Sequence, residues 1–160
     1  MTRYATRRKD RMITDAEAFQ LLQETEYGIL STVDEDGMPY GVPVNYVLLD
    51  DNKIYMHSTN QASHKLTNIG NGCKACFTVV DHVELQPAMF TTKYMSAMAF
   101  GNASLVTDKD ERETALKAIV KKYSYSVLAK GIAFIGAYID KTAVIKLDVD
   151  YISGKGNKKS

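Results

Sequence analysis

The chain has 160 residues, of which 45% are hydrophobic and 24% are charged, and this size and composition are typical of one globular domain. A chain of this length buries about 68–70% of its unfolded surface, so it needs no disulfides to build a core. Its 20 basic and 19 acidic residues are unevenly spread, because residues 1–12 and 153–160 carry eight of the bases and one acid. Residues 13–152 therefore have a net charge of −6, which argues against a nucleic-acid-binding surface on the fold itself.

The sequence carries no sign of a membrane span, a secretory signal or a disulfide framework. The longest apolar run, residues 132–139, is far shorter than the roughly 20 residues that a span requires. The basic N-terminus is followed by no apolar segment, and two cysteines cannot build a framework. We therefore expect a cytoplasmic protein with one domain over residues 13–152, between solvated basic tails at 1–12 and 153–160.

The first element expected in chain order is a helix that begins at Thr14. Thr14 and Glu17 have the spacing of a capping box, and the flanking Ile13 and Ala18 can form the hydrophobic staple around it. Three strands follow, because three segments rich in β-forming residues are separated by short clusters of turn residues. Turns this short join antiparallel neighbours, so we expect a meander. The strands are 27–33, 42–49 and 54–58, and the turns are 34–37 and 50–52.

A short helix is expected next, over residues 63–71, with Ser63 as its N-cap and Gly72 as its stop. Two further strands follow it. The apolar residues then return to helical spacing, which predicts a longer helix starting near Asp108. The two strands are 77–83 and 94–106, and the elements that complete the chain are a helical segment at 126–139 and a strand at 143–149.

The last strand alternates strictly between two faces. The odd positions from Ala143 to Val149 are apolar, whereas Val144, Lys146 and Asp148 occupy the other face, which we expect to be solvated. Six strands in a meander, without strand–helix–strand alternation, argue against a doubly wound sheet. The expected fold class is mainly β, a small six-stranded antiparallel barrel with helices at its ends.

Ser63, His64 and Lys65 form the first candidate site, at the start of the short helix. A helix start offers free N–H groups and a partial positive charge, which suit a phosphate, and these side chains add a hydroxyl, a ring nitrogen and a full charge. Residues 58–60, just before them, are small and polar. The alternative interpretation is an ordinary capped helix on the surface.

The strand at 42–49 carries a second candidate site. Pro43 within it removes a ladder hydrogen bond, so this strand belongs at an edge or a bulge, and its free backbone groups can bind a planar ligand. Asn45 adds a donor and an acceptor. The alternative interpretation is an irregular barrel strand that binds nothing.

The histidines and cysteines give weaker signals. His57, His64 and His82 lie at no recurrent metal-ligand spacing, so no metal site is expected, and His57 is either a polar ligand contact or a core residue. Cys73 and Cys76 are three residues apart, so in a strand they face opposite sides and cannot bond. The sequence contains no nucleophile elbow, P-loop or dinucleotide motif, so any chemistry depends on something that the protein binds.

The order and spacing of these segments resemble the nitroimidazole-resistance (Nim) proteins, a branch of the pyridoxamine 5′-phosphate oxidase-like flavoproteins. The likeness covers roughly residues 8–155, and the ordered set of segments is more specific than any one of them. The segments that carry it are 8–11, 27–33, 39–46, 54–58, 76–80, 90–96 and 141–145, together with His64-Lys65 and Phe100-Gly101.

The resemblance implies an FMN-binding split β-barrel that forms a homodimer with its flavin sites at the subunit interface. It further implies that one group of residues holds the phosphate, a second group borders the isoalloxazine ring, and a third approaches the partner's flavin. The phosphate group of residues is Ser58, Thr59, Ser63, His64 and Lys65. The ring group is Val42, Pro43, Val44 and Asn45, and the residues near the partner's flavin are Tyr94 and Ser96.

Two features of this sequence depart from the pattern of the family. His64 and Lys65 stand where related proteins carry an arginine pair, which predicts weaker or pH-dependent phosphate binding through His64. The loop at 61–63, Gln-Ala-Ser, replaces an acidic-Gly turn.

The function expected from the resemblance is that of an FMN-dependent oxidoreductase. The electrons come from a nicotinamide or another reductant and pass to a small acceptor such as a nitroaromatic, with His57 near the ring or substrate as the catalytic candidate. No nucleic-acid or membrane partner is expected. The alternatives are a protein that stores or senses FMN without turnover, and a split barrel that binds another flat cofactor such as haem or a deazaflavin.

Overall fold

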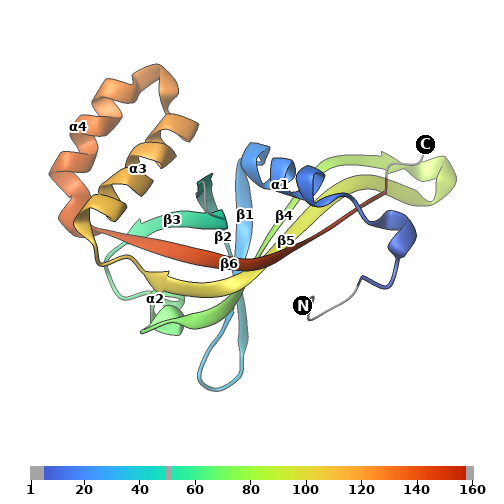
Figure 1. The fold of residues 1–160 in the computed structure, drawn as a ribbon, viewed down its shortest axis with the longest axis horizontal. Helices are drawn as coiled ribbons and strands as arrows, with labels where there is room; N and C mark the ends of the chain where they lie inside the picture. Colours follow the sequence, from blue (N-terminus) through green and yellow to red (C-terminus); the bar gives the residue numbers. More distant parts are fainter. Residues whose placement is uncertain (1–5, 50–51, 158–160) are drawn as a thin grey trace.

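The computed structural model describes residues 6–49 and 52–157, which fold around a closed antiparallel barrel (Figure 1). Within these residues the barrel has six strands in the order β1-β2-β3-β6-β5-β4, and β4 returns to β1. The expected mainly β, six-stranded antiparallel split barrel with flanking helices is therefore confirmed. The strands are β1 (Tyr27–Val33), β2 (Pro39–Leu49), β3 (Lys53–Thr59), β4 (Cys73–Gln86), β5 (Thr91–Leu105) and β6 (Thr142–Asn157).

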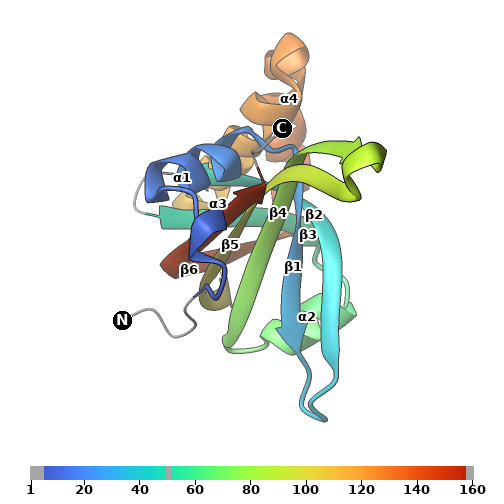
Figure 2. The same cartoon turned by 90° about the vertical axis from the view of Figure 1, so that its right-hand side faces the viewer.

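Helices flank the barrel on several sides. The first packs against β5 and β6, the second follows β3 and packs against β1, and the last two form a hairpin beside β3 (Figures 1 and 2). None of the helices in the described residues is long and apolar enough to cross a membrane. The helices are α1 (Asp15–Glu24), α2 (His64–Ile69), α3 (Lys109–Tyr123) and α4 (Leu128–Tyr138), with 3-10 turns at Lys9–Arg11, Pro87–Met89, Tyr125–Val127 and Ile139–Lys141.

Local hydrogen bonds explain where the first elements begin and turn. The Glu17 N–H donates to Thr14 Oγ1 at 3.2 Å and the Thr14 N–H donates to Glu17 Oε2 at 2.8 Å, which completes the expected capping box. After β1, the Asp34 carboxylate accepts two backbone N–H groups and Gly37 adopts a φ of +83°, so the chain reverses into β2. Of the turn expected at 50–52, residues 50 and 51 lie outside the described residues.

Large apolar side chains fill the inside of the barrel. The rings of Tyr46 and Phe77 meet edge to face with centroids 4.5 Å apart, and the Tyr46 hydroxyl donates to the Leu22 carbonyl of α1 at 2.6 Å. All three side chains are completely buried. Because the interior of so small a barrel is packed with its own side chains, a flat ligand must bind outside it.

A second core lies between the α3–α4 hairpin and the outer face of the sheet. Ile119 of α3 packs there with Tyr55 of β3 and Val144 of β6. The expectation that the face of the last strand bearing Val144 is solvated is wrong, because α3 and α4 cover it and leave Val144 only 1% exposed. Lys146, farther along this face, lies 3.0 Å from the carboxylate of Glu111.

The last strand continues well beyond the expected end at Val149. Asp150 is an extra residue in its pairing with β5, because Phe100 pairs with Tyr151 and Gly101 with Val149. This bulge shifts the alternation by one position: Val149 packs on the core before it, and Ile152 packs on the core after it. Residues 153–157, expected in a tail, are therefore part of the barrel.

The N-terminal segment also lies against the barrel. Met12 forms an isolated bridge to Lys155, and the hydroxyls of Thr6 and Ser153 lie 3.3 Å apart. Residues 6–12, expected in a solvated tail, thus cross the outer face of β5 and β6.

The far ends of β4 and β5 project from the barrel as a two-stranded ribbon (Figures 1 and 2). Their register shifts between Asp81 and Glu84, and His82 at this shift has a φ of +53°. Phe90 at the tip also has a positive φ and is 96% exposed. The other exposed apolar side chains of the ribbon are Val83, Leu85 and Met89.

Candidate functional site

Strands β2 and β3 pair over only part of their length and then separate. Their ladder joins residues 46–49 to 53–56 and ends at the pair Tyr46 and Met56. Beyond it, residues 39–45 pair with β1 alone and residues 57–59 pair with β6 alone. We call the facing, unpaired edges of these two segments the β2–β3 fork, and Figure 2 shows β2 leaving the line of β3 there. Such edges present free N–H and C=O groups, which are suited to a polar planar ligand.

The β2 side of the fork contains the expected proline strand. Pro43 pairs with Ile29 of β1 and has no partner from β3, so the expectation of an edge at this proline is confirmed. Along this segment the side chains alternate: Val42 and Val44 pack toward the core, whereas Pro43 and Asn45 are exposed. The Asn45 side chain donates to the Glu26 carbonyl at 3.4 Å, which turns it toward the start of β1.

Ser63 and Lys65 at the start of α2 follow the β3 side of the fork in the chain, and the charge of Lys65 acts on His57 there. Ser63 is the N-cap residue, but its hydroxyl caps no N–H group. This oxygen is buried and has no hydrogen-bond partner among the described residues, although buried hydroxyls in proteins are nearly always paired. Lys65 is half-buried and forms no salt bridge within the described residues. A hydroxyl and an ammonium group that lack partners fit an anionic group from a ligand.

His64, between them, faces the other side of α2. Its ring lies against that of Tyr40 with centroids 4.3 Å apart, and its Nε2 is 3.6 Å from Asp34 Oδ2. A hollow of about 440 Å³ on this side is lined by Asp34, Glu35 and Asp36. These carboxylates repel a phosphate, so the side of α2 that the His64 ring faces is less favourable for an anion than the side with Ser63 and Lys65.

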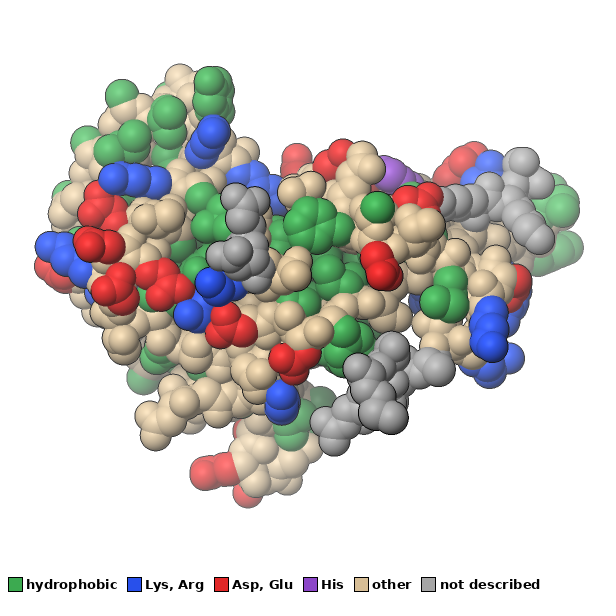
Figure 3. All heavy atoms as spheres, viewed as in Figure 1, with side chains coloured by type: hydrophobic (Ala, Val, Ile, Leu, Met, Phe, Trp, Pro, Cys, Tyr) green, Lys and Arg blue, Asp and Glu red, His purple; other side chains and the backbone are tan. Residues whose placement is uncertain are grey.

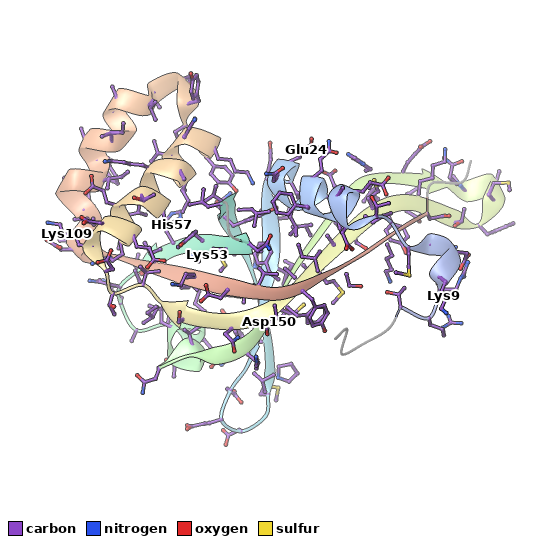
Figure 4. All side chains as sticks on the ribbon, viewed as in Figure 1. Lys9, Glu24, Lys53, His57, Lys109 and Asp150 are labelled. Carbon is purple, nitrogen blue, oxygen red and sulfur yellow. The ribbon has the colours of Figure 1, made fainter. Side chains whose placement is uncertain are left out.

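His57 lies at the point where the two strands diverge. It pairs with Val144 of β6 and sits on the side of β3 that faces α3 (Figure 4). The surrounding protein, and then the charge of Lys65, lower the pKa of His57, which keeps its ring neutral at pH 7. A neutral imidazole can both donate and accept a proton at the fork. Ser58 and Thr59 continue β3 from His57 toward α2.

Tyr94 and Ser96 do not join this group within one chain. The α2 end of β5 is marked by Ala103, which pairs with Cys73 just after α2. Tyr94 is nine residues farther along the strand, a separation of about 30 Å at the usual rise per residue. The structure thus brings together residues 42–45, 57–59 and 63–65 and leaves Tyr94 and Ser96 at the other end of β5.

Tyr123 and Lys122 support the fork, a role that sequence reasoning did not predict. The Tyr123 hydroxyl lies 3.0 Å from the Tyr46 nitrogen and 2.8 Å from the Tyr46 oxygen, next to the last β2–β3 pair. Lys122 Nζ donates to the Thr25 carbonyl at 2.8 Å and lies 4.1 Å above the Tyr46 ring, and its burial lowers its pKa to about 8. Tyr123 is one of the apolar residues at helical spacing that predict the helix after Asp108, so the sequence predicts a core position for it. No local pattern reveals its contact with β2.

The two cysteines lie apart from the fork and do not bond. Cys73 packs toward the barrel core, whereas Cys76 faces outward beside Phe100, so the expected placement on opposite faces is confirmed. Burial raises the pKa of both thiols, which makes them poor nucleophiles. Within the described part of the chain, no three His, Cys, Asp or Glu side chains are grouped to hold a metal ion.

A closed six-stranded antiparallel barrel, opened at one fork and followed there by a short helix, defines a split-barrel protein. A family model described as pyridoxamine 5′-phosphate oxidase matches residues 14–156. The chain belongs to this family, which confirms the resemblance found in the sequence.

Several solved structures share this fold at low sequence identity. A candidate 5-nitroimidazole antibiotic resistance protein from Bacteroides thetaiotaomicron is 21% identical, with a TM-score of 0.70 over 91% of this chain and 86% of that one. A FAD and haem binding protein from Mycobacterium smegmatis is 21% identical, with a TM-score of 0.72 over 91% and 72%. A FAD-binding protein from Mesorhizobium loti is 19% identical, with a TM-score of 0.64 over 92% and 98%. No curated protein matches the sequence.

Proposed function

We propose that this protein is a flavin-dependent oxidoreductase that holds FMN at the β2–β3 fork and reduces small acceptors such as nitroaromatics. The observation that carries the proposal is the buried Ser63 hydroxyl, which lacks a partner beside the unpaired Lys65 at the start of α2. Membership in the pyridoxamine 5′-phosphate oxidase family supports it, as do the FAD-binding proteins of similar fold. The half-buried, unbonded cysteines suit the reducing cytoplasm in which we expect the protein to act.

The fork has separate places for the two ends of the cofactor. Ser63 and Lys65 would bind the phosphate together with backbone N–H groups at the start of α2. Because α2 has only six residues, the lysine charge and the hydroxyl contribute more than the helix dipole. The unpaired edge of residues 42–45 would bind the polar rim of the ring, and Ser58 and Thr59 offer hydroxyls between the two places.

His57 is the residue we assign to proton transfer. When bound, the flavin supplies the ring that accepts and returns electrons, and the protein supplies its orientation and a proton. His57 stands at the divergence of the strands, and its lowered pKa leaves one ring nitrogen free to accept a proton at pH 7. Lys65 contributes to that lowering, so the residue that binds the phosphate also helps to keep His57 neutral.

We further propose that two copies of the chain complete each site. Because Tyr94 and Ser96 lie about 30 and 23 Å along β5 from its α2 end, a second copy that supplies them would bring them to a flavin held at α2. The apolar ribbon supports such a dimer, since Leu85 is 71% and Phe90 is 96% exposed in the single chain.

The purified protein provides the first test through its absorption spectrum and the mass of any small molecule released on denaturation. Released FMN would support the proposal as stated, and released FAD would keep the flavin but change its identity. Haem or a deazaflavin would reject it. Anaerobic addition of NADH or NADPH, followed by a nitroimidazole, should bleach the flavin and then restore its colour. A flavin that no reductant bleaches would leave a storage or sensor protein instead.

A further inference from the structure

A second hollow lies far from α2, between the N-terminal segment and the outer face of β5 and β6. It has a volume of about 580 Å³, which is within the range of small-molecule sites. Residues 6–12 form one wall and are held in place by the Thr6 and Met12 contacts to β6. Because Arg7, Arg8 and Arg11 line this wall, we call the hollow the arginine groove.

The floor of the arginine groove is flat and partly aromatic. Alternate residues of β5 face outward there, so Tyr94, Ser96 and Phe100 line the floor in a row. The Phe100 ring stacks on Tyr151 with centroids 4.8 Å apart and an angle of 16° between the planes. Aromatic floors of this kind stack well against the planar rings of ligands.

The walls carry more positive charge than the neighbouring Asp10 neutralises. Arg8 is paired with Asp10 through two hydrogen bonds of 2.8 and 2.6 Å. Arg7, Arg11 and Lys155 have no carboxylate partner within residues 6–49 and 52–157, and none of the described residues that line the groove is Asp or Glu. Figure 3 shows basic side chains gathered at this end of the molecule, over the turn Lys9–Arg11.

We propose that the arginine groove binds a nucleoside diphosphate group, with the diphosphate between Arg7, Arg11 and Lys155 and the base on the aromatic floor. Three unpaired cations call for a ligand with two or more negative charges, and arginine binds phosphate oxygens through paired N–H donors. A nucleoside diphosphate combines that charge with a planar base, and the groove has room for both.

The same group occurs in free ADP, in nicotinamide dinucleotides and in the ADP portion of FAD. The inference rests on the proposed function in one respect, since Tyr94 and Ser96 belong both to this groove and to the side offered to a partner's flavin. A bound nicotinamide dinucleotide or FAD would thus lie next to the flavin site of a dimer.

Calorimetric titration of the purified protein with ADP, pyrophosphate and adenosine tests the groove. ADP should bind, and the double variant Arg7→Gln/Arg11→Gln should weaken it at least about tenfold, as expected for the loss of charge-assisted hydrogen bonds. Lys130→Gln, which removes an exposed cation on α4, is the matched control and should leave ADP binding unchanged. Phe100→Ala should weaken ADP but not pyrophosphate, since only ADP has a base to stack.

Competition experiments show which molecule supplies the nucleoside diphosphate group. If NADPH displaces ADP while the flavin stays bound, the groove serves the electron donor. If the protein is purified with FAD, the ADP portion of FAD already fills the groove, and added ADP is not expected to bind. The supporting result is then that the double variant loses FAD more readily than the control. Equal ADP affinity in the double variant and the control overturns the inference, as does an FMN-loaded protein that binds no ADP. ADP binding by a protein that holds no flavin would uphold the groove and reject the proposed function.

Discussion

Ser63→Ala should weaken cofactor binding without destabilising the flavin-free protein. An N-cap serine normally contributes about 0.5–2 kcal/mol to stability through its side-chain bond to the helix. Ser63 makes no such bond, and its buried oxygen has no partner among the described residues. A buried hydroxyl without a partner costs about 1–3 kcal/mol. Its removal should therefore leave the melting temperature of the flavin-free protein unchanged or raise it by a few degrees.

The effect on the cofactor has the opposite sign. If the Ser63 hydroxyl donates to a phosphate, its loss removes a hydrogen bond to a charged group, which is worth about 1.5–3 kcal/mol or roughly ten- to 150-fold in Kd. Flavin fluorescence during titration with FMN measures the affinity, and thermal unfolding of the flavin-free protein measures the stability.

Thr14→Ala is the matched control for this experiment. Thr14 caps α1 with a real side-chain bond from the Glu17 N–H at 3.2 Å, so its loss should lower stability by about 0.5–2 kcal/mol and leave FMN affinity intact. The reasoning is refuted if Ser63→Ala destabilises the flavin-free protein as much as Thr14→Ala and FMN binds both variants equally well.

Three further changes test other parts of the structure. Lys65→Ala should raise the Kd for FMN at least about tenfold in the same titration, and an unchanged Kd would remove Lys65 from the phosphate site. The pKa of Lys122 is lowered to about 8 in the folded protein, so between pH 8 and 10 this amine holds its proton in the unfolded chain but has lost it in the folded one. The free energy of unfolding should therefore rise with pH in this range, by at most ~1.4 kcal/mol per pH unit. Urea unfolding at pH 8, 9 and 10 should show a shallower rise in Lys122→Met, and parallel profiles would contradict the burial of this amine. Gly154→Ala should lower stability by about 1–3 kcal/mol, because its new Cβ would lie 2.6 Å from Ile13 and 2.7 Å from Ala18. Gly136→Ala, with no atom within 4 Å of the new Cβ, should be neutral or stabilising by thermal unfolding, and equal losses in both would refute the packing argument.

The sequence predicted the elements whose signals are local. The capping box at Thr14 and Glu17 and the strand at 27–33 depend on neighbouring residues alone, and both are confirmed. The solvated face expected at Val144 failed because the cover comes from α3 and α4, which alternation within one strand cannot reveal. The end of β6 was missed because Asp150 interrupts the alternation and the residues after it resemble a loop.

The candidate site also combines residues that local signals predict with features that depend on tertiary contacts. Pro43 and Ser63 were found because a proline in a strand and a serine before a helix have known local consequences. The fork itself depends on where the β2–β3 ladder ends, which is a property of pairing between strands. The sequence predicts a solvated tail for the arginines of residues 6–12, and only the packing of that segment on β6 makes them one wall of a groove.

The extra residue at Asp150 lets one strand serve two regions of the protein. Before it, β6 pairs with the His57 side of the fork, and after it Ser153 and Lys155 line the arginine groove. Deleting Asp150 would remove the extra residue and restore strict alternation, and Val149 and Ile152 would both stay on the core while Lys155 stayed at the groove. The extra residue therefore bends β6 without exchanging its two faces, so one continuous strand contributes to the fork at one end and to the arginine groove at the other.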